Sequence, residues 1–338
     1  MAMRLIIVCI TLLFMSNQMA NSQPINKNKK DHFITQIMQA PLASPPIGDK
    51  HVLYPFATHW QHAKTENERS GSEKAFDELA GNLYKQSQSE QSYKITLTIE
   101  NLKQVFNIPY DIYSDIIDDI LKQEIKVHVE KLASSPHFDL FLLTTESLDL
   151  KCNPCEFESK FTLQTIISIS ADKIIDKLVV AYKYGSDIGR SYRFFYYNKE
   201  KIIIRELERD EINSFASEIT TYQLSSQGKF IRYYDENGPF QNQEEQGLVQ
   251  NHTREGLWIE IKPNGYTHNN TYLEAEYKNG LPVNIWKFYQ LEQHYNELNE
   301  PILSTRKKGK LLYTETYKDG ELVNRVFIDD EVAKIKKG

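Results

Sequence analysis

The residues best suited to chemistry in this sequence are two cysteines, Cys152 and Cys155, separated by an asparagine and a proline. Two thiols at this spacing can form a small disulfide, act as a redox pair, or supply two of the four ligands of a zinc site. A redox role is disfavoured because no aromatic-rich strand precedes the first thiol and the carboxylates that follow would raise its pKa. Zinc would need two further ligands, and no second CxxC or paired histidine follows at a suitable spacing. The sequence therefore favours a structural disulfide, with the other two interpretations left open.

Two further groups of candidate ligands are weaker. His59 and His62 lie three residues apart in a proline-interrupted segment without a carboxylate partner, which is typical of a solvated loop. A helix is expected to begin near Pro109, and four aspartates lie mostly off its apolar stripe, at Asp111, Asp115, Asp118 and Asp119. Their spacing is not that of a calcium-binding loop, so a solvated helix face is expected.

The common catalytic motifs are absent from the sequence. There is no G-x-S-x-G, H-E-x-x-H, P-loop or G-x-G-x-x-G motif. Catalytic residues that are distant in sequence leave no such motif, so a hydrolase with its site in the N-terminal half stays an alternative. We expect a non-enzymatic protein, with no cofactor and no metal.

The N-terminus has the features of an export signal. Arg4 precedes an apolar run from Leu5 to Met15, which is too short to span a bilayer, since spanning takes about 20 residues. Ala20 and Ser22 place small residues at positions −3 and −1 of a cleavage site before Gln23. We therefore expect a signal peptide over 1–22 and an exported protein that does not span the membrane. It would be periplasmic in a Gram-negative cell and secreted otherwise, where a disulfide can persist.

Composition limits the kind of partner. The 338 residues are 40% hydrophobic and 12% aromatic, which predicts a folded chain with room for about two domains. The net charge is −6 and becomes −7 when a signal peptide carrying Arg4 is removed. An acidic chain argues against a nucleic-acid partner held by phosphate contacts.

The sequence pattern predicts two domains after a leader. Residues 23–70 are polar and interrupted by prolines, which predicts a loosely packed leader. A helix is expected over 72–88, capped by Ser70 and Glu73, with an apolar stripe that includes Phe76 and Leu79. Period-two alternation predicts strands at 93–99, 138–144, 161–170, 177–184, 190–197 and 201–208, and residues 210–216 suggest a short helix. Residues 71–222 are thus expected to form an α+β domain with an antiparallel sheet.

Residues 223–338 contain a repeat. A small turn residue, any residue and a large aromatic recur every 28 residues, at Gly228–Phe230, Gly256–Trp258 and Asn284–Trp286. A second pattern, Tyr-Lys-Asn/Asp-Gly, occurs at Tyr277–Gly280 and Tyr317–Gly320. Asn-Gly pairs also end at Gly238 and Gly265. Such pairs favour type I′ turns, which require positive φ at both central residues, so the pattern predicts a series of hairpins.

These motifs resemble MORN-variant repeats of the YwqK type, a family often described as an antitoxin component. The resemblance covers roughly residues 228–325, with Asn284 where the family usually has Gly and with insertions near 241–254 and 291–301. It implies an all-β, MORN-like sheet of hairpins that serves as an interaction surface. The repeated aromatics Phe230, Trp258 and Trp286 are expected to form its core, and the insertions are the expected contact regions.

The function expected from these features is binding of a protein partner outside the cytoplasm. Its most specific form is an immunity protein that neutralises a toxin acting in the periplasm, with the acidic charge favouring association with a basic toxin. An envelope-associated structural or interaction protein without a toxin partner is the alternative from another class. The sequence identifies no binding residues.

Overall fold

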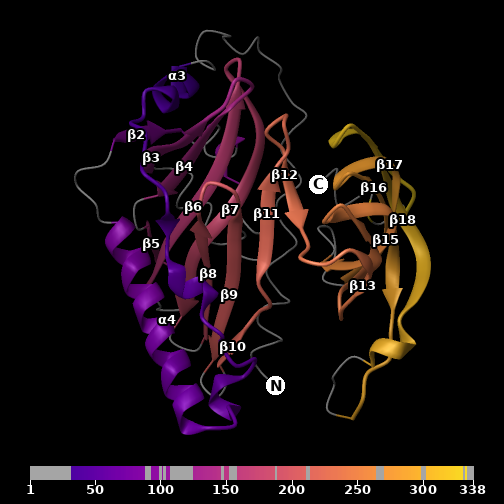
Figure 1. Cartoon of the computed structure of the whole chain (residues 1–338). Coiled ribbons are helices and arrows are strands. Elements are labelled where there is room, and N and C mark those ends of the chain that lie inside the picture. Colours follow the sequence, from indigo (N-terminus) through magenta and orange to yellow (C-terminus); the bar gives the residue numbers. More distant parts are fainter. Residues whose placement is uncertain are drawn as a thin grey trace. The chain divides into compact units, whose positions relative to one another are not determined.

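The computed structural model describes most of the chain from residue 32 onward (Figure 1). The described residues are 32–87, 93–98, 101, 104–106, 125–145, 148–151, 158–186, 189–210, 214–263, 270–297, 302–329 and 332. Predictions that fall outside them concern the signal segment with Ser22 and Gln23, the helix near Pro109, Cys152, Cys155 and Gly265. Among the described helices, none combines the length and the apolar character that a bilayer crossing demands.

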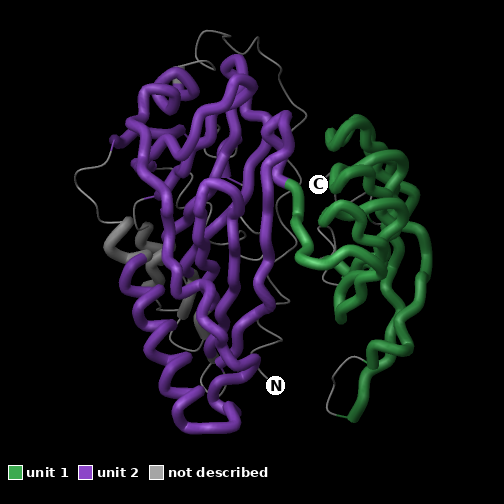
Figure 2. The backbone as a smooth tube through the Cα atoms, in the orientation of Figure 1, with its two compact units in different colours: residues 1–23, 231–338 green, residues 24–230 purple. Residues whose placement is uncertain are grey.

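The chain divides into two compact units, coloured purple and green in Figure 2. The N-terminal unit ends at Phe230 and the C-terminal unit begins at Ile231. The predicted boundary, between residues 222 and 223, lies before the turn at Gly228. Each unit contains an open sheet, and the described chain is mostly antiparallel β.

The N-terminal unit is built on a twelve-stranded sheet in the order β12-β11-β9-β8-β7-β6-β4-β3-β2, with β1 on β8, β10 on β9 and β5 on β6. The strands of this sheet are β1 (Ile47–Gly48), β2 (Lys94–Leu97), β3 (Ile125–Ser134), β4 (Asp139–Thr145), β5 (Leu148–Lys151), β6 (Glu158–Ser170), β7 (Lys173–Ser186), β8 (Gly189–Tyr197), β9 (Ile202–Asp210), β10 (Ser214–Ala216), β11 (Thr220–Leu224) and β12 (Phe230–Tyr233). Of β12, only Phe230 belongs to the N-terminal unit. Strands β6 to β9 pair antiparallel in chain order, which confirms the predicted meander. The short helix expected over 210–216 is wrong, because Ser214–Ala216 instead pair with β9.

Helix α4 (Glu66–Ser87) begins earlier than predicted. The hydroxyl of Thr65 accepts a hydrogen bond from the backbone N–H of Glu68 at 3.2 Å, so Thr65 is the N-cap. Thr65 and Glu68 have the same capping-box spacing as Ser70 and Glu73, and the earlier pair starts the helix. Phe76, from the predicted apolar stripe, is buried against Tyr192 of β8 with ring centroids 5.1 Å apart.

The twelve-stranded sheet has an apolar core on both faces. Alternate residues of β4 belong to different clusters, with Phe141 and Leu143 in one and Leu140 and Leu142 in the other. Helix α3 (His32–Met38) contributes Ile37 to the first cluster. The second receives side chains from the 3₁₀ turns η1 (Lys50–Leu53) and η2 (Trp60–His62) and from α4, namely Val52, Trp60, Phe76 and Leu79.

The described part of the predicted leader, residues 32–70, therefore differs from the expectation of loose packing. Ile37, Val52 and Trp60 are fully buried. Each short turn or helix places only one or a few apolar side chains on the sheet, so the segment carries no periodic hydrophobic pattern that sequence analysis could detect.

The C-terminal unit is a seven-stranded antiparallel sheet whose strands follow chain order. They are β13 (Gly238–Gln241), β14 (Glu245–Gln250), β15 (Thr253–Pro263), β16 (Asn270–Lys278), β17 (Leu281–Glu292), β18 (Lys307–Lys318) and β19 (Glu321–Phe327), with the 3₁₀ turn η4 (Leu303–Thr305) before β18. The region 241–254, expected to be an inserted loop, contains all of β14 and the start of β15.

Three of its hairpins turn with positive φ at both central residues, as type I′ turns require. The predicted pairs Asn279–Gly280 (φ 51° and 76°) and Asp319–Gly320 (φ 51° and 82°) are confirmed. Asn251 and His252 (φ 51° and 62°) form a third that was not predicted. The turn predicted at Asn237–Gly238 is wrong, because only the glycine has positive φ, and the side chain of Asn237 accepts a hydrogen bond from the backbone N–H of His252.

Candidate functional site

The repeated tripeptide places its tryptophans at equivalent positions in β15 and β17. Gly256 and Asn284 both have positive φ, 67° and 59°, and each precedes Trp by two residues. The pairing register shifts beside both tripeptides, so each forms a β-bulge. The first copy is separated from these two, since Gly228 (φ 82°) and Phe230 lie in the N-terminal unit and Phe230 packs against its core.

The two tryptophans are held in the same way. The indole N–H of Trp258 donates to the carbonyl of Leu248 at 3.2 Å, and that of Trp286 donates to the carbonyl of Glu276 at 3.1 Å. The two carbonyls are themselves 28 residues apart. A Cβ at Gly247 would lie 2.3 Å from the Trp258 indole, so this position must be glycine for the ring to lie flat on β14. Position 275, its equivalent under Trp286, is a fully buried alanine.

Aromatic rings contact one another across one face of the seven-stranded sheet, which we call the aromatic face. Trp286 lies 5.1 Å from Tyr277 and 4.5 Å from Tyr317 between ring centroids. On its other side, Tyr277 lies 6.4 Å from Trp258, and Trp258 lies 5.5 Å from Tyr234, again between ring centroids. Trp258 is fully buried and Trp286 nearly so. These two tryptophans therefore belong to the core, as expected.

Arg254 lies among these rings as a buried cation. It donates to the hydroxyl of Tyr234 at 2.8 Å, to the hydroxyl of Tyr277 at 2.7 Å and to Glu260 at 3.0 Å, and it also pairs with Glu245. Its guanidinium carbon lies 4.8 Å from the centroid of Trp258, within cation–π range. The arginine thus links three adjacent strands, β14, β15 and β16.

The charges in this cluster are stabilised by one another. Burial alone would raise the pKa of Glu260, but Lys262 at 2.7 Å and Arg254 lower that pKa to about 2. Burial raises the pKa of Tyr234 to about 12 and also raises that of Tyr277, so both hydroxyls stay protonated and can donate. Glu245, Arg254 and Glu260 each have an oppositely charged partner, so the cluster contains no unpaired charge.

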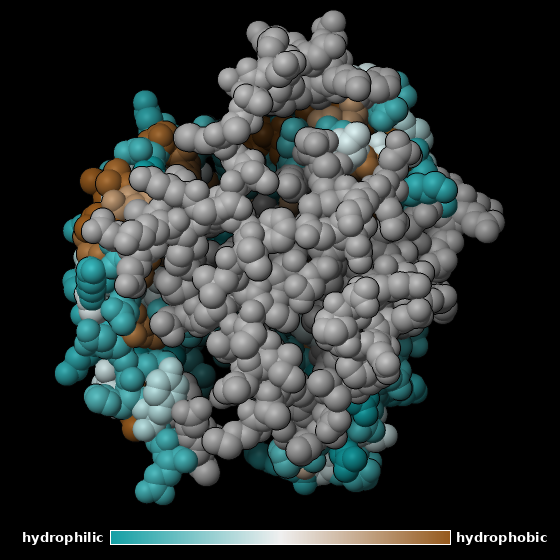
Figure 3. Space-filling view, turned by 180° about the vertical axis from the view of Figure 1, so that it is seen from behind, coloured by the Kyte–Doolittle hydropathy of each residue, from teal (hydrophilic) through white to brown (hydrophobic). Residues whose placement is uncertain are grey.

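The opposite face of the sheet, which we call the open face, exposes large apolar side chains. Leu257 is 63% exposed and Ile285 is 54% exposed, and each is the middle residue of a repeated tripeptide, next to a buried tryptophan. Leu248, on β14, is 45% exposed. The bulges thus turn an apolar side chain outward at the same point of both repeats. Figure 3 shows hydrophobic residues exposed at the left margin of the view, among hydrophilic ones.

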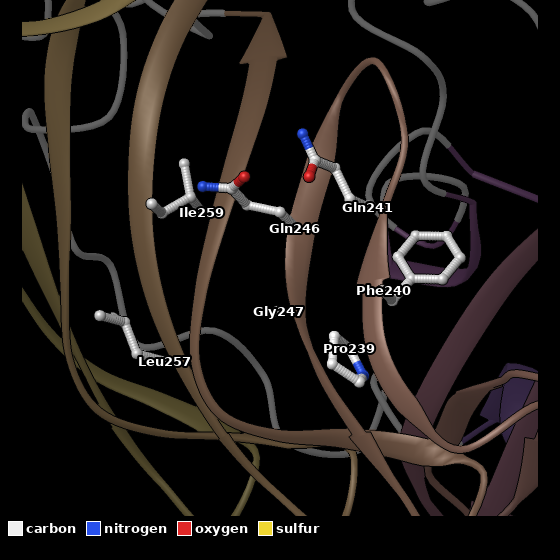
Figure 4. A pocket seen from close by; sticks show the side chains of 7 residues that line it. All are labelled: Pro239, Phe240, Gln241, Gln246, Gly247, Leu257 and Ile259. Carbon is white, nitrogen blue, oxygen red and sulfur yellow. The ribbon is translucent and has the colours of Figure 1, made fainter.

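A hollow of about 480 Å³ opens at the β13–β15 end of the sheet (Figure 4). It is lined by Pro239, Phe240, Gln241, Gln246, Gly247, Leu257 and Ile259. Gln241 pairs with Gln246, and Gln246 pairs with Ile259, so these side chains share one face. Phe240 points away from the others in Figure 4 and contacts Tyr234 on the aromatic face.

Among the described residues of the N-terminal unit, Asp49 and His51 form a carboxylate–imidazole pair. Asp49 contacts Nδ1 of His51 at 2.8 Å and accepts a hydrogen bond from Asn82. Burial alone would raise the pKa of Asp49, but the hydrogen bonds from His51 and Asn82 lower it overall. The cavity beside Asp49 is about 10 Å³, which is the size of about one water molecule and too small for a substrate.

The other candidate ligands in the described residues form no site. His59 and His62 are exposed, with ring centroids 6.2 Å apart. Within the described ranges, no group of three or more histidine, cysteine, aspartate or glutamate side chains could hold a metal ion.

Comparison of the chain with protein-family models, with curated proteins and with solved structures finds no match in any of the three. The functional argument therefore rests on the geometry of the two sheets.

Proposed function

We propose that the chain binds a protein partner through the open face of the seven-stranded sheet. The observation that carries this proposal is the exposure of Leu248, Leu257 and Ile285 on a sheet whose other face is closely packed. Leu257 and Ile285 lie at repeated positions on two strands, with Glu276 on the strand between them. Exposed apolar side chains interspersed with polar ones are a feature of many protein-binding surfaces. The buried Arg254 cluster supports the proposal because it fixes the strands that present these side chains.

The partner that best fits the sequence is a toxin that acts outside the cytoplasm, which would make the chain an exported immunity protein. The predicted signal peptide, the acidic net charge and the resemblance to YwqK-type repeats support this form of the proposal. The two bulged tripeptides, 28 residues apart and each ending in a buried tryptophan, are compatible with a MORN-like hairpin sheet. We also infer an α+β layout for the N-terminal unit, supported by the packing of Phe76 of α4 on Tyr192 of the sheet.

The experiment compares variants for binding to the protein encoded by the adjacent gene. Calorimetry should show a tight one-to-one complex with the unmodified chain. Ile285→Asp places a charge on the open face and should weaken that complex by at least tenfold, since a charge at the centre of an interface must be desolvated. Leu53→Asp is the matched control, because Leu53 is an exposed apolar residue of the N-terminal unit.

The two variants should have the same thermal stability within error, because both residues are exposed. Two results together would reject the immunity function. The first is that the unmodified chain forms no complex with the adjacent-gene protein. The second is that cells lacking this chain survive expression of the adjacent gene. Equal binding by Ile285→Asp and the unmodified chain would reject the open face as the binding site.

A further inference from the structure

The hollow at the β13–β15 end differs chemically from the rest of the open face. Its seven lining residues include no charged side chain, although 25% of the chain is charged. The neighbouring strand β16 borders the hollow with two carboxylates: Glu274, opposite Ile259, pairs with Lys308 at 2.6 Å, and Glu276 lies opposite Leu257. With no cation in the lining and these carboxylates beside it, the hollow disfavours an anionic ligand group, because burying that group would cost its hydration without an ion pair in return.

The lining combines an apolar wall with amides. Leu257 and Ile259 form one side, while Gln241 and Gln246 lie directly opposite each other on β13 and β14 (Figure 4). Each glutamine amide can donate and accept, which matches the N–H and C=O groups of a peptide backbone. An apolar side chain flanked by peptide bonds is therefore the group that this lining complements.

The hollow also indicates how such a peptide would lie. Strand β13 is the outer strand at this end of the sheet, and its second residue, Pro239, has no backbone N–H to offer an added strand. Extension of the sheet by a partner strand is therefore disfavoured at this edge. A segment that crosses the open face would instead place its side chain in the hollow and its backbone beside the two amides.

We propose that this hollow binds a large, uncharged side chain, such as phenylalanine or leucine, presented by an extended segment of the protein partner. The inference rests on the proposed function, because it names the anchor group that the open face recognises. The hollow is open to solvent and has a volume of about 480 Å³, which leaves room for one such side chain.

The first test uses two capped pentapeptides as probes. One has phenylalanine at its centre with two threonines on each side, and the other has aspartate at the centre. In ¹⁵N–¹H spectra of the full chain, the phenylalanine peptide should shift the backbone amide of Gly247 and the side-chain amides of Gln241 and Gln246. Its affinity should exceed that of the aspartate peptide by at least tenfold. Equal affinities, or shifts that leave these three residues unchanged, would overturn the proposal.

A matched pair of variants then relates the hollow to the partner. Gln246→Glu places a charge in the hollow with almost no change of shape, whereas Gln250→Glu makes the same change on the same strand and face outside it. Gln246→Glu should weaken both the phenylalanine peptide and the adjacent-gene protein by at least tenfold, and Gln250→Glu should change either affinity by less than twofold.

The outcomes separate this inference from the proposed function. If Ile285→Asp weakens the protein complex but Gln246→Glu does not, the open face binds the partner and the hollow is not its anchor site. If Gln246→Glu weakens the peptide while neither variant affects the protein complex, the hollow has the proposed chemistry and the proposed function is wrong.

Discussion

The two sheets differ in how many of their faces are buried. In β4 of the twelve-stranded sheet, the neighbours Leu142 and Leu143 point to opposite faces and both are buried, because each face carries its own apolar cluster. In β15 of the seven-stranded sheet, the neighbours Leu257 and Trp258 also point to opposite faces, but only the tryptophan is buried. A sheet covered on both faces is a scaffold, whereas a sheet covered on one face can offer the other to a partner.

The cores also differ in the kind of polar group that they bury. The buried polar side chains of the twelve-stranded sheet are mostly uncharged, and many carry a hydroxyl, such as Thr144, Thr165 and Ser168. The seven-stranded sheet buries carboxylates and a guanidinium, with Glu245, Glu260 and Arg254 in contact. Stability of the C-terminal unit should therefore depend more strongly on pH, since its core contains groups that must stay ionised.

The largest expected effects test the one-sided packing. Leu142→Ala and Leu143→Ala in β4 should each lower the free energy of unfolding by about 2–5 kcal/mol, because each leaves a cavity in a core. Trp258→Ala should cost about 3–5 kcal/mol for the same reason, whereas Leu257→Ala should change stability by less than about 0.5 kcal/mol. Urea unfolding followed by circular dichroism measures all four variants. A loss for Leu257→Ala as large as that for Trp258→Ala would show that the open face is covered.

An intermediate effect is expected from acid. The pKa of Glu260 is about 2 in the folded chain against 4.5 for the ordinary group, so its ionised form stabilises the fold above pH 4.5. This stabilisation, on the order of 3 kcal/mol, should be lost as the pH falls from 4.5 towards 2. Unfolding measured at several pH values should show the loss, and Glu260→Gln should be less stable at pH 7 with a shallower decline. Glu236→Gln, at an exposed glutamate of the same unit, is the control and should follow the unmodified chain. A decline for Glu260→Gln as steep as that of the unmodified chain would assign the pH dependence to other groups.

The strands were predictable where local pattern decides the structure. Two local patterns were sufficient, because each depends on only a few neighbouring residues. Period-two alternation predicted β4 and β6 to β9, and Asn/Asp-Gly pairs predicted the turns at 279–280 and 319–320. The structure confirms both. The segment 32–70 was not predictable, because its buried residues are held by sheet faces formed much later in the chain.

The Arg254 cluster was missed for a related reason. Its partners Glu245 and Glu260 lie on adjacent strands, and their contact depends on a strand, β14, that was interpreted as an inserted loop. The residue types of β14 gave no period-two signal, because the charged Glu245 is buried and the apolar Leu248 is exposed. The hollow could not have been predicted, since it depends on a bulge and on the register of three strands.

The smallest expected effect concerns the bulges that turn Leu257 and Ile285 towards solvent. Gly256 and Asn284 share positive φ, a conformation that glycine and asparagine tolerate and a β-branched residue does not. Exchange of the two residue types, in Gly256→Asn or Asn284→Gly, should therefore change the free energy of unfolding by less than about 0.5 kcal/mol. Asn284→Val should cost about 1–2 kcal/mol, because valine strains the backbone there. Thermal unfolding of the three variants tests this order, and Thr316→Val, on the neighbouring strand β18, is the control for the introduction of valine itself. If Asn284→Val were as stable as Asn284→Gly, the bulge would not need positive φ. The outward orientation of Ile285 would then depend on something other than the repeat.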